Sequence, residues 1–197
     1  MLDFIVEVEK KGYLVLDEAN LLTLAKCEKF TIIRDVIISD ADSADTELVA
    51  SRCEFPFHTD GTFLTIPPKY VVIIVKEAQS GGQISLSNID STLKRTIIGM
   101  RAKYRSNTSV FESPIYNESL CMFRYRRDFM SPTNGMLDSE FQDMLDDIES
   151  KLTNRQILVG KIDPGYGIIL NNHNFVHKRS EFAGRRVIRR IWLDINS

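Results

Sequence analysis

The stretch "PGYGIILNNHNFVHKRSEFAGRRVIRRIWLD", residues 164–194, predicts two β-strands joined by a segment that contains two histidines. Residues 167–172 and 185–195 are rich in β-branched side chains, which suit a pleated, half-buried surface. The pair Pro164-Gly165 is a turn signal in front of the first run. This part of the chain therefore indicates a sheet.

Working outward, the same kind of pattern recurs along the chain. Four further runs rich in β-branched residues predict strands over residues 30–39, 70–78, 82–89 and 156–162. Residues 40–56 and 106–135 lack clear periodicity and are expected to be loops. Many short strands with few helices favour a sandwich or barrel over alternating βα units.

Two segments have helical spacing instead. Apolar residues recur every three or four positions within 137–152, and Ser139 with Gln142 would form a capping box at its start. A second helix is predicted over Ser91–Arg105, and a further one around residues 19–29.

Length and composition predict one soluble domain, residues 1–197. The chain is 43% hydrophobic and has a formal net charge of −2, so no overall basic field recruits nucleic acid. No apolar run reaches membrane-spanning length, and the N-terminus lacks the features of a signal peptide. The three cysteines, Cys27, Cys53 and Cys121, are odd in number and far apart, which suits reduced thiols in the cytoplasm. An oligomer is possible.

The stretch "FPFHTDGTF", residues 55–63, places His58 and Asp60 two residues apart. On an extended backbone both side chains project to one face, where an imidazole and a carboxylate can bind one metal ion. A distant histidine, His173 or His177, would complete the two-His-one-carboxylate set of non-haem Fe(II) sites. Alone the pair is a weak signal, because such residues are common at strand ends.

Arg186 and Arg190 also share one face of their strand, with Ile188 between them. Two like charges that face into a barrel are costly without an anion, and a dicarboxylate co-substrate would supply one. Arg185 and Arg189 lie on the opposite face, where solvated charges on an edge strand are expected.

Three motifs together resemble a known family. "HTDG", "PPKYVVIIVKEAQSGGQ" and "PGYGIILNNHNFVHKRSEFAGRRVIRR" are similar to the iron(II)- and 2-oxoglutarate-dependent oxygenases of the taurine dioxygenase and clavaminate synthase-like superfamily. The resemblance covers residues 55–90 and 160–194, about a third of the chain. It implies a mainly β fold with some α-helix (α+β), a double-stranded β-helix or jelly-roll barrel with flanking helices.

The resemblance also implies roles for residues. Fe(II) would be held by His58, Asp60 and His177, and His173 would be a solvent-facing or loop residue. Arg186 would grip the distal carboxylate of 2-oxoglutarate, and Arg190 would face the co-substrate or the substrate. With dioxygen, such enzymes couple oxidative decarboxylation of 2-oxoglutarate to succinate and CO2 with hydroxylation. The carboxylate ligand disfavours halogenation, whereas desaturation and cyclisation stay open.

The sequence departs from the family in the wall of the co-substrate pocket. Where relatives have Gly-Gly-x-Thr, this chain has Gly81-Gly82-Gln83-Ile84. Either Ser85, one position later, replaces the threonine hydroxyl through a bulge, or the pocket lacks that hydroxyl.

The substrate is expected to be small and polar, an amino acid or a related carboxylate. Its carboxylate could be bound by Arg124 or Arg126, which lie in "FRYRRDF", or by Arg179 or Arg190. Residues 123–129 could equally be a rim strand or lid with solvated arginines. Neither nucleic acid nor a membrane is an expected partner of the protein. Alternative functions are a nucleic-acid or protein demethylase, a non-catalytic cupin-like binding protein, and a degenerate homologue that binds iron but turns over poorly.

Overall fold

The structure is a computed structural model that describes residues 2–39, 51–106 and 109–196. Its α-helices are α1 (Leu2–Lys11), α2 (Glu18–Ala25), α3 (Ser91–Ile97) and α4 (Asp138–Asn154). Its longer strands are β1 (Tyr13–Asp17), β2 (Phe30–Ser39), β3 (Phe55–His58), β4 (Tyr70–Gly81), β5 (Ile84–Asn88), β6 (Arg101–Arg105), β7 (Val110–Pro114), β11 (Ile157–Gly160), β12 (Tyr166–Asn171), β13 (Phe175–Arg179) and β14 (Phe182–Ile195). Two-residue strands are β8 (Tyr116–Asn117), β9 (Met122–Phe123) and β10 (Met130–Ser131).

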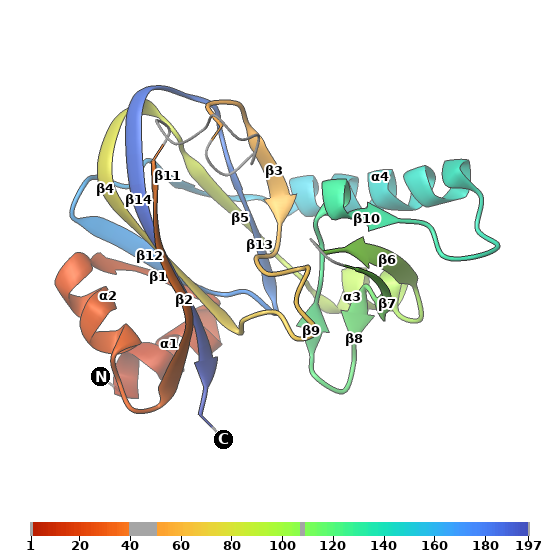
Figure 1. The fold of residues 1–197 in the computed structure, drawn as a ribbon, viewed down its shortest axis with the longest axis horizontal. Coiled ribbons are helices and arrows are strands. Elements are labelled where there is room, and N and C mark those ends of the chain that lie inside the picture. The colour runs from red at the N-terminus through yellow and green to blue at the C-terminus, as the bar shows by residue number, and fades with distance from the viewer. Residues whose placement is uncertain (1, 40–50, 107–108, 197) are drawn as a thin grey trace.

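Two antiparallel sheets form the centre of the molecule (Figure 1). The five-stranded sheet has the order β1-β12-β4-β14-β2, and the four-stranded sheet has the order β11-β5-β13-β3. Along the chain the strands alternate between the sheets: β2 and β4 belong to the first, β3 and β5 to the second, and β12, β13 and β14 continue the alternation. The predicted mainly β class with a few helices is confirmed.

The first half of strand β4, residues 70–75, is apolar and buried on both faces. Val71, Ile73 and Val75 pack between the two sheets, together with Ile188 and Trp192 of β14. The intervening side chains pack outward against α1 and α2, in a cluster that includes Tyr70, Val72, Ile74, Leu21 and Leu24. An uninterrupted run of β-branched residues is what a strand buried on both sides requires.

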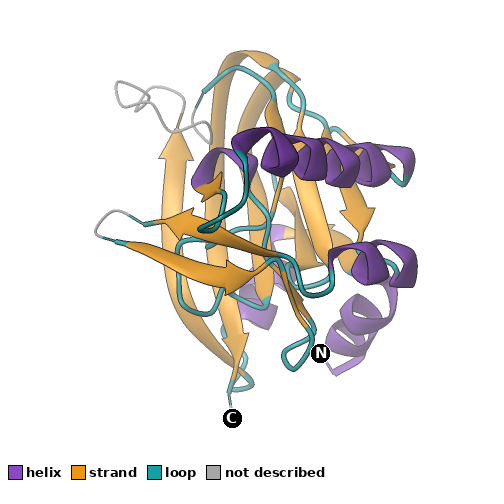
Figure 2. Ribbon diagram, turned by 90° about the vertical axis from the view of Figure 1, so that its right-hand side faces the viewer, coloured by secondary structure: helices purple, strands orange, loops and turns teal. Residues whose placement is uncertain are grey.

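The outer face of the four-stranded sheet is covered by α3, α4 and the small strands β6 to β9 (Figure 2). Helix α4 contributes its predicted apolar stripe, Phe141, Leu145, Ile148 and Leu152. Its start differs from the prediction: the Glu140 carboxylate accepts a hydrogen bond from the Leu137 N–H at 3.1 Å, so the box does not begin at Ser139.

Other boundaries also differ. The helix predicted over Ser91–Arg105 ends at Ile97, because Gly99 adopts a left-handed φ of +77° and the chain continues as β6. The segment 106–135 contains β7 to β10 rather than only loops, and residues 40–50 of the other predicted loop lie outside the described residues. Helix α1 and strand β1 were not predicted. No helix among the described residues is long and apolar enough to cross a membrane.

Candidate metal centre

The two predicted histidine ligands lie side by side on adjacent strands of the four-stranded sheet. His58 ends β3 and pairs directly with His177 of β13, so their ring centroids are 4.1 Å apart. Asp60 lies in the turn after β3 rather than on an extended strand, but its carboxylate still reaches the imidazoles. One ligand atom from each of the three buried residues lies within 4.8 Å of the others.

The nitrogens that point into this cluster are available to a metal ion. His58 Nδ1 lies 2.8 Å from the Pro56 carbonyl, to which it donates, so the lone pair of the neutral ring is on Nε2. His58 Nε2 is 3.5 Å from Asp60 Oδ1. Among the described residues, neither His58 Nε2 nor either ring nitrogen of His177 has a hydrogen-bond partner. Buried nitrogens without partners are costly, and a divalent metal ion would satisfy one ring nitrogen of each histidine.

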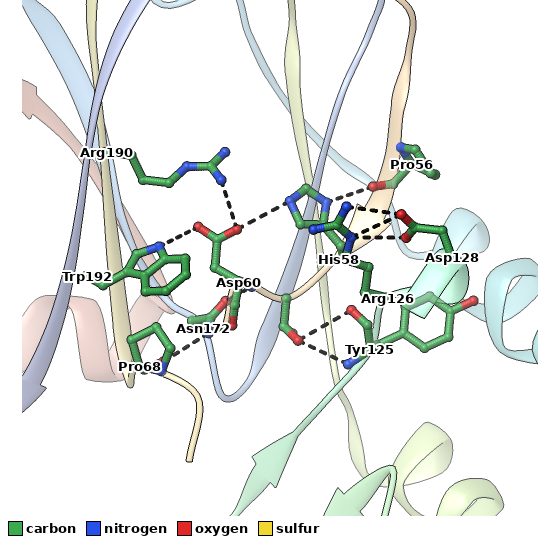
Figure 3. Close-up of polar contacts among 11 residues, drawn as sticks. Pro56, His58, Asp60, Pro68, Tyr125, Arg126, Asp128, Asn172, Arg190 and Trp192 are labelled. Carbon is green, nitrogen blue, oxygen red and sulfur yellow. Dashed lines mark hydrogen bonds and ion pairs between the residues drawn. The ribbon is translucent and has the colours of Figure 1, made fainter. Parts of the chain in front are cut away.

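Asp60 is positioned by two other segments (Figure 3). Arg190 donates to Oδ1 at 3.2 Å and Trp192 Nε1 donates to Oδ2 at 3.0 Å. The Asn172 side chain accepts from the Asp60 N–H at 2.8 Å and donates to its carbonyl at 3.1 Å. The turn after β12 thus holds the backbone of Asp60, and one face of β14 holds its carboxylate.

Burial and charge set the protonation states in this centre. Burial lowers the pKa of His58, which its contact with Asp60 only partly offsets, and lowers the pKa of His177 well below its usual value. Burial alone would raise the pKa of Asp60, but the positive charge of Arg190 and the contact with His58 outweigh it, so this pKa is far below the usual range. Neutral imidazoles and an ionised carboxylate are the forms that bind metal ions.

A small pocket continues from the two histidines toward three arginines. Arg179, Arg186 and Arg190 line it together with Phe55 and Ile84. It encloses about 20 Å³, room for about one water molecule. A ligand larger than a water molecule would fit only if side chains that line the pocket moved. The long side chains of the three arginines are among those that would have to move.

Ser85 does not reach this pocket, which corrects one predicted role. Ile84 and Leu86 face the core between the sheets, so Ser85 points to the other face of β5. Its hydroxyl accepts a hydrogen bond from Gln156 Nε2 at 3.0 Å. No register shift brings it back, since β5 pairs with β13 in regular register from Ile84 to Asn88.

Arg124 and Arg126 have different surroundings. Arg124 is 1% exposed and donates to the carbonyls of Thr62, Leu64 and Thr65 at 2.6–2.8 Å, which makes it a support for that loop and corrects its predicted role in substrate binding. Arg126 pairs with Asp128 at 3.0 Å.

The Arg126 guanidinium also lies over the rings of Phe55 and Phe129, and the Arg126 backbone pairs with that of His58. Of the two arginines of this stretch that were predicted to bind the substrate, Arg126 alone lies near the centre.

The remaining predicted residues, His173, Arg185 and Arg189, lie outside the cluster. His173 is buried in the turn before β13 and its Nε2 lies 3.0 Å from the Pro67 carbonyl, so it is neither solvent-facing nor part of the cluster. Arg185 and Arg189 lie on the outer face as predicted, paired with Glu77 and Asp35. Their strand is not an edge strand, because β14 lies between β4 and β2.

Trp192 and Asn172 were not predicted to support the site. Trp192 could have been found, because it shares the face of Arg186, Ile188 and Arg190 by even spacing. Nothing local marks Asn172 as the residue that fixes Asp60, since the two are 112 positions apart.

Comparison with solved structures identifies proteins of the same fold. A putative alpha-ketoglutarate-dependent taurine dioxygenase from Burkholderia xenovorans aligns with 100% of this chain and 84% of its own, with a TM-score of 0.71 and 16% identity. The non-heme iron oxygenase OrfP, in complex with Fe and alpha-ketoglutaric acid, aligns over 99% of this chain and 79% of its own, with a TM-score of 0.69 and 15% identity.

Asparagine oxygenase, in complex with Fe(II), 2S,3S-3-hydroxyasparagine and succinate, aligns over 74% of this chain, with a TM-score of 0.60 and 14% identity. The alignment spans about half, 51%, of that enzyme's own length. No protein-family model matches the sequence, and no curated protein matches it. At these identities the likeness establishes a shared fold, and the predicted resemblance to iron- and 2-oxoglutarate-dependent oxygenases is confirmed at that level.

Proposed function

We propose that this chain is an Fe(II)- and 2-oxoglutarate-dependent dioxygenase with a double-stranded β-helix, one domain over residues 1–197. The observation that carries the proposal is the buried cluster of His58, Asp60 and His177, whose inward nitrogens have no hydrogen-bond partner among the described residues. The alternation of strands between two antiparallel sheets supports the fold assignment, because it is the connectivity of a jelly roll. The three free cysteines support the proposed cytoplasmic location.

In this proposal, His58, Asp60 and His177 hold the iron. When bound, iron with 2-oxoglutarate and dioxygen would supply the oxidising power for hydroxylation of the substrate, with succinate and CO2 as co-products. The protein orients the ligands: the Pro56 carbonyl fixes the tautomer of His58, and Trp192 with Arg190 holds the carboxylate of Asp60. Burial of all three ligands excludes bulk water.

Arg186 is the proposed anchor for the distal carboxylate of 2-oxoglutarate. It is buried at the end of the pocket that begins at His58 and His177, and a planar guanidinium matches a carboxylate bidentately. Arg190 lies four residues after Arg186 on β14 and donates to Asp60. From this position we propose that it contacts either the co-substrate or the substrate.

For the substrate we propose a small amino acid or related carboxylate. Solved structures of the same fold contain hydroxyasparagine and (3S)-hydroxy-L-Arg, which supports an amino acid. Arg126 is the proposed contact for its carboxylate, since its backbone pairs with that of His58 and its guanidinium lies over Phe55.

The test is anaerobic titration of the protein with Fe(II) and 2-oxoglutarate, which should produce a weak metal-to-ligand charge-transfer band in the visible. In air, succinate release should then rise with at least one member of a panel of amino acids and small carboxylates. A protein that shows neither the band nor succinate is not such an oxygenase, and a band without succinate from any panel member would indicate a non-catalytic binding protein.

A further inference from the structure

A second cavity, separate from the pocket beside the histidines, borders the turn that joins β12 to β13. It has a volume of about 320 Å³ and lies between the end of α1, the segment that leads into α3, and residues 171–175. This volume is within the range of small-molecule sites, roughly 300–1,000 Å³. The polar side chains that line it are Glu9, Lys10, Lys11, Lys94 and three asparagines.

The one acidic residue among the described residues of the cavity wall is already matched within the protein. The Glu9 carboxylate accepts a hydrogen bond from the Tyr70 hydroxyl and pairs with Lys69 at 2.9 Å. Its second oxygen lies 3.4 Å from Asn171 Nδ2. The negative charge of Glu9 is therefore offset by Lys69, which lies outside the cavity wall.

Two of the three lysines have no carboxylate to neutralise them. Lys11 pairs with Glu7, one helical turn earlier in α1. Within the part of the chain that the structure describes, neither Lys10 nor Lys94 has an ion-pair partner, and Lys94 Nζ lies only at 3.4 Å from the neutral Asn174 Oδ1. The cavity thus has two uncompensated positive charges on opposite walls, one from α1 and one from α3.

Amide groups add uncharged donors to these two cations. Asn174 turns its Oδ1 toward Lys94, which leaves its Nδ2 without a hydrogen-bond partner among the described residues. The Asn88 side chain, at the end of β5, likewise has no partner within the described ranges. Ammonium and amide N–H groups around one space suit an oxyanion, and lysine is a common ligand of phosphate as a point charge.

The turn that borders the cavity also holds the candidate metal centre. Asn171 and Asn174 line the cavity, and Asn172 between them bonds to both the N–H and the carbonyl of Asp60, at 2.8 and 3.1 Å. The turn is closed by the Asn174 N–H, which donates to the Asn171 carbonyl at 3.2 Å. A ligand that fixes this turn from the cavity would therefore also fix the backbone of Asp60.

We propose that this cavity binds a phosphate monoester, whose phosphate group contacts Lys10 and Lys94 and the side-chain amides of Asn88 and Asn174. The phosphate of such a ligand is largely dianionic at neutral pH, which matches the two cations. The volume of the cavity leaves room for a small organic part beside the phosphate. The bound ligand stabilises residues 171–174 and so tightens metal binding; this last step alone rests on the proposed function.

The test is calorimetry of the metal-free protein at pH 7.5 and constant ionic strength with three probes: glycerol 3-phosphate, inorganic phosphate and glycerol. Glycerol 3-phosphate should bind at one saturable site, inorganic phosphate more weakly at the same site, and glycerol not at all. The double variant Lys10→Gln/Lys94→Gln should weaken glycerol 3-phosphate by about 10- to 100-fold, because it removes hydrogen bonds between charged groups.

The matched control is Lys26→Gln/Lys29→Gln, which removes the same two charges from the segment after α2, away from the cavity. Binding of glycerol 3-phosphate should stay within about twofold of wild type in this control. Equal losses in the two double variants would show unspecific attraction to positive charge and would overturn the site. Absence of saturable binding to the wild type, or equal binding by wild type and Lys10→Gln/Lys94→Gln, would overturn it too.

The link to the metal centre is tested by Mn(II) titration with and without saturating glycerol 3-phosphate. The wild type should bind Mn(II) about fivefold more tightly with the ligand, a coupling that Lys10→Gln/Lys94→Gln should lose. Equal Mn(II) affinity with and without ligand in the wild type would overturn the role of the turn. A wild type that binds glycerol 3-phosphate but no metal ion would instead overturn the proposed function.

Discussion

The three histidines of the chain differ in what holds their ring nitrogens. His58 donates Nδ1–H to Pro56, and His173 reaches the Pro67 carbonyl, whereas neither nitrogen of His177 has a hydrogen-bond partner among the described residues. A buried imidazole without a partner is costly, and a metal ion at the cluster would compensate by binding one of the two nitrogens. His173 has its partner in the protein and needs no metal.

This difference gives a prediction for two matched variants. His177→Ala should abolish Fe(II) or Mn(II) binding, measured by calorimetry or by metal content after dialysis, because it removes one of three ligands. His173→Ala should keep full metal binding and lose about 1–3 kcal/mol of unfolding free energy, because the buried Pro67 carbonyl loses its partner. Equal loss of metal binding in both variants would mean that the wrong histidine has been assigned.

At the scale of elements, the turn between β4 and β5 positions the arginine end of the pocket. Gly81 and Gly82 both have positive φ, at +75° and +70°. A Cβ on Gly81 would lie 2.5 Å from the Glu181 carbonyl oxygen, whereas a Cβ on Gly82 would lie 3.5 Å from Arg186 Nε. The missing Cβ of Gly81 thus allows β14 to pack closely against the turn. At Gly82 there is room for a Cβ, and glycine is favoured there only because of the positive φ.

Alanine at these two positions should therefore have unequal effects. Gly82→Ala should lower the free energy of unfolding by about 1–2 kcal/mol, the cost of a left-handed residue with a Cβ. Gly81→Ala carries that cost and a clash with backbone, and should lose about 1–3 kcal/mol more. Urea denaturation of both variants measures the difference; equal losses would show that backbone conformation alone decides.

Most long strands could be predicted from the sequence, because a strand buried on both faces carries an unbroken β-branched run, as in β4. Strands of two residues, such as β8 and β9, are too short to show any period. In the site, His58, Asp60 and His177 follow from a motif, and the inward face of β14 from even spacing. The outward turn of Ser85 and the tie from Asn172 to Asp60 depend on pairing between distant segments, which no local pattern encodes.

The molecule as a whole keeps its titratable histidines inside while its net charge is only −2. His58, His173 and His177 are all buried, and burial is the leading cause that lowers the pKa of each. The fold holds these imidazoles neutral at neutral pH, so that they can bind a metal ion or donate to backbone carbonyls. The same property makes the folded state sensitive to acid.

The metal-free protein should become less stable as the pH falls below about 6.5, where histidines of the unfolded chain begin to bind protons. The folded chain binds those protons only at lower pH, because the pKa of all three histidines is lowered. The unfolded state therefore gains protons first, and each histidine removes up to about 1.4 kcal/mol of unfolding free energy per pH unit. Asp60, whose pKa is also lowered, acts in the same direction but only below about pH 4.

Urea denaturation in the presence of a chelator, at about pH 7.5, 6.5 and 5.5, measures this effect. The free energy of unfolding should stay flat and then decline as the pH falls, and His173→Gln should make that decline shallower by up to a third. A stability that is constant over this range would mean that the folded chain protonates its histidines as readily as the unfolded one.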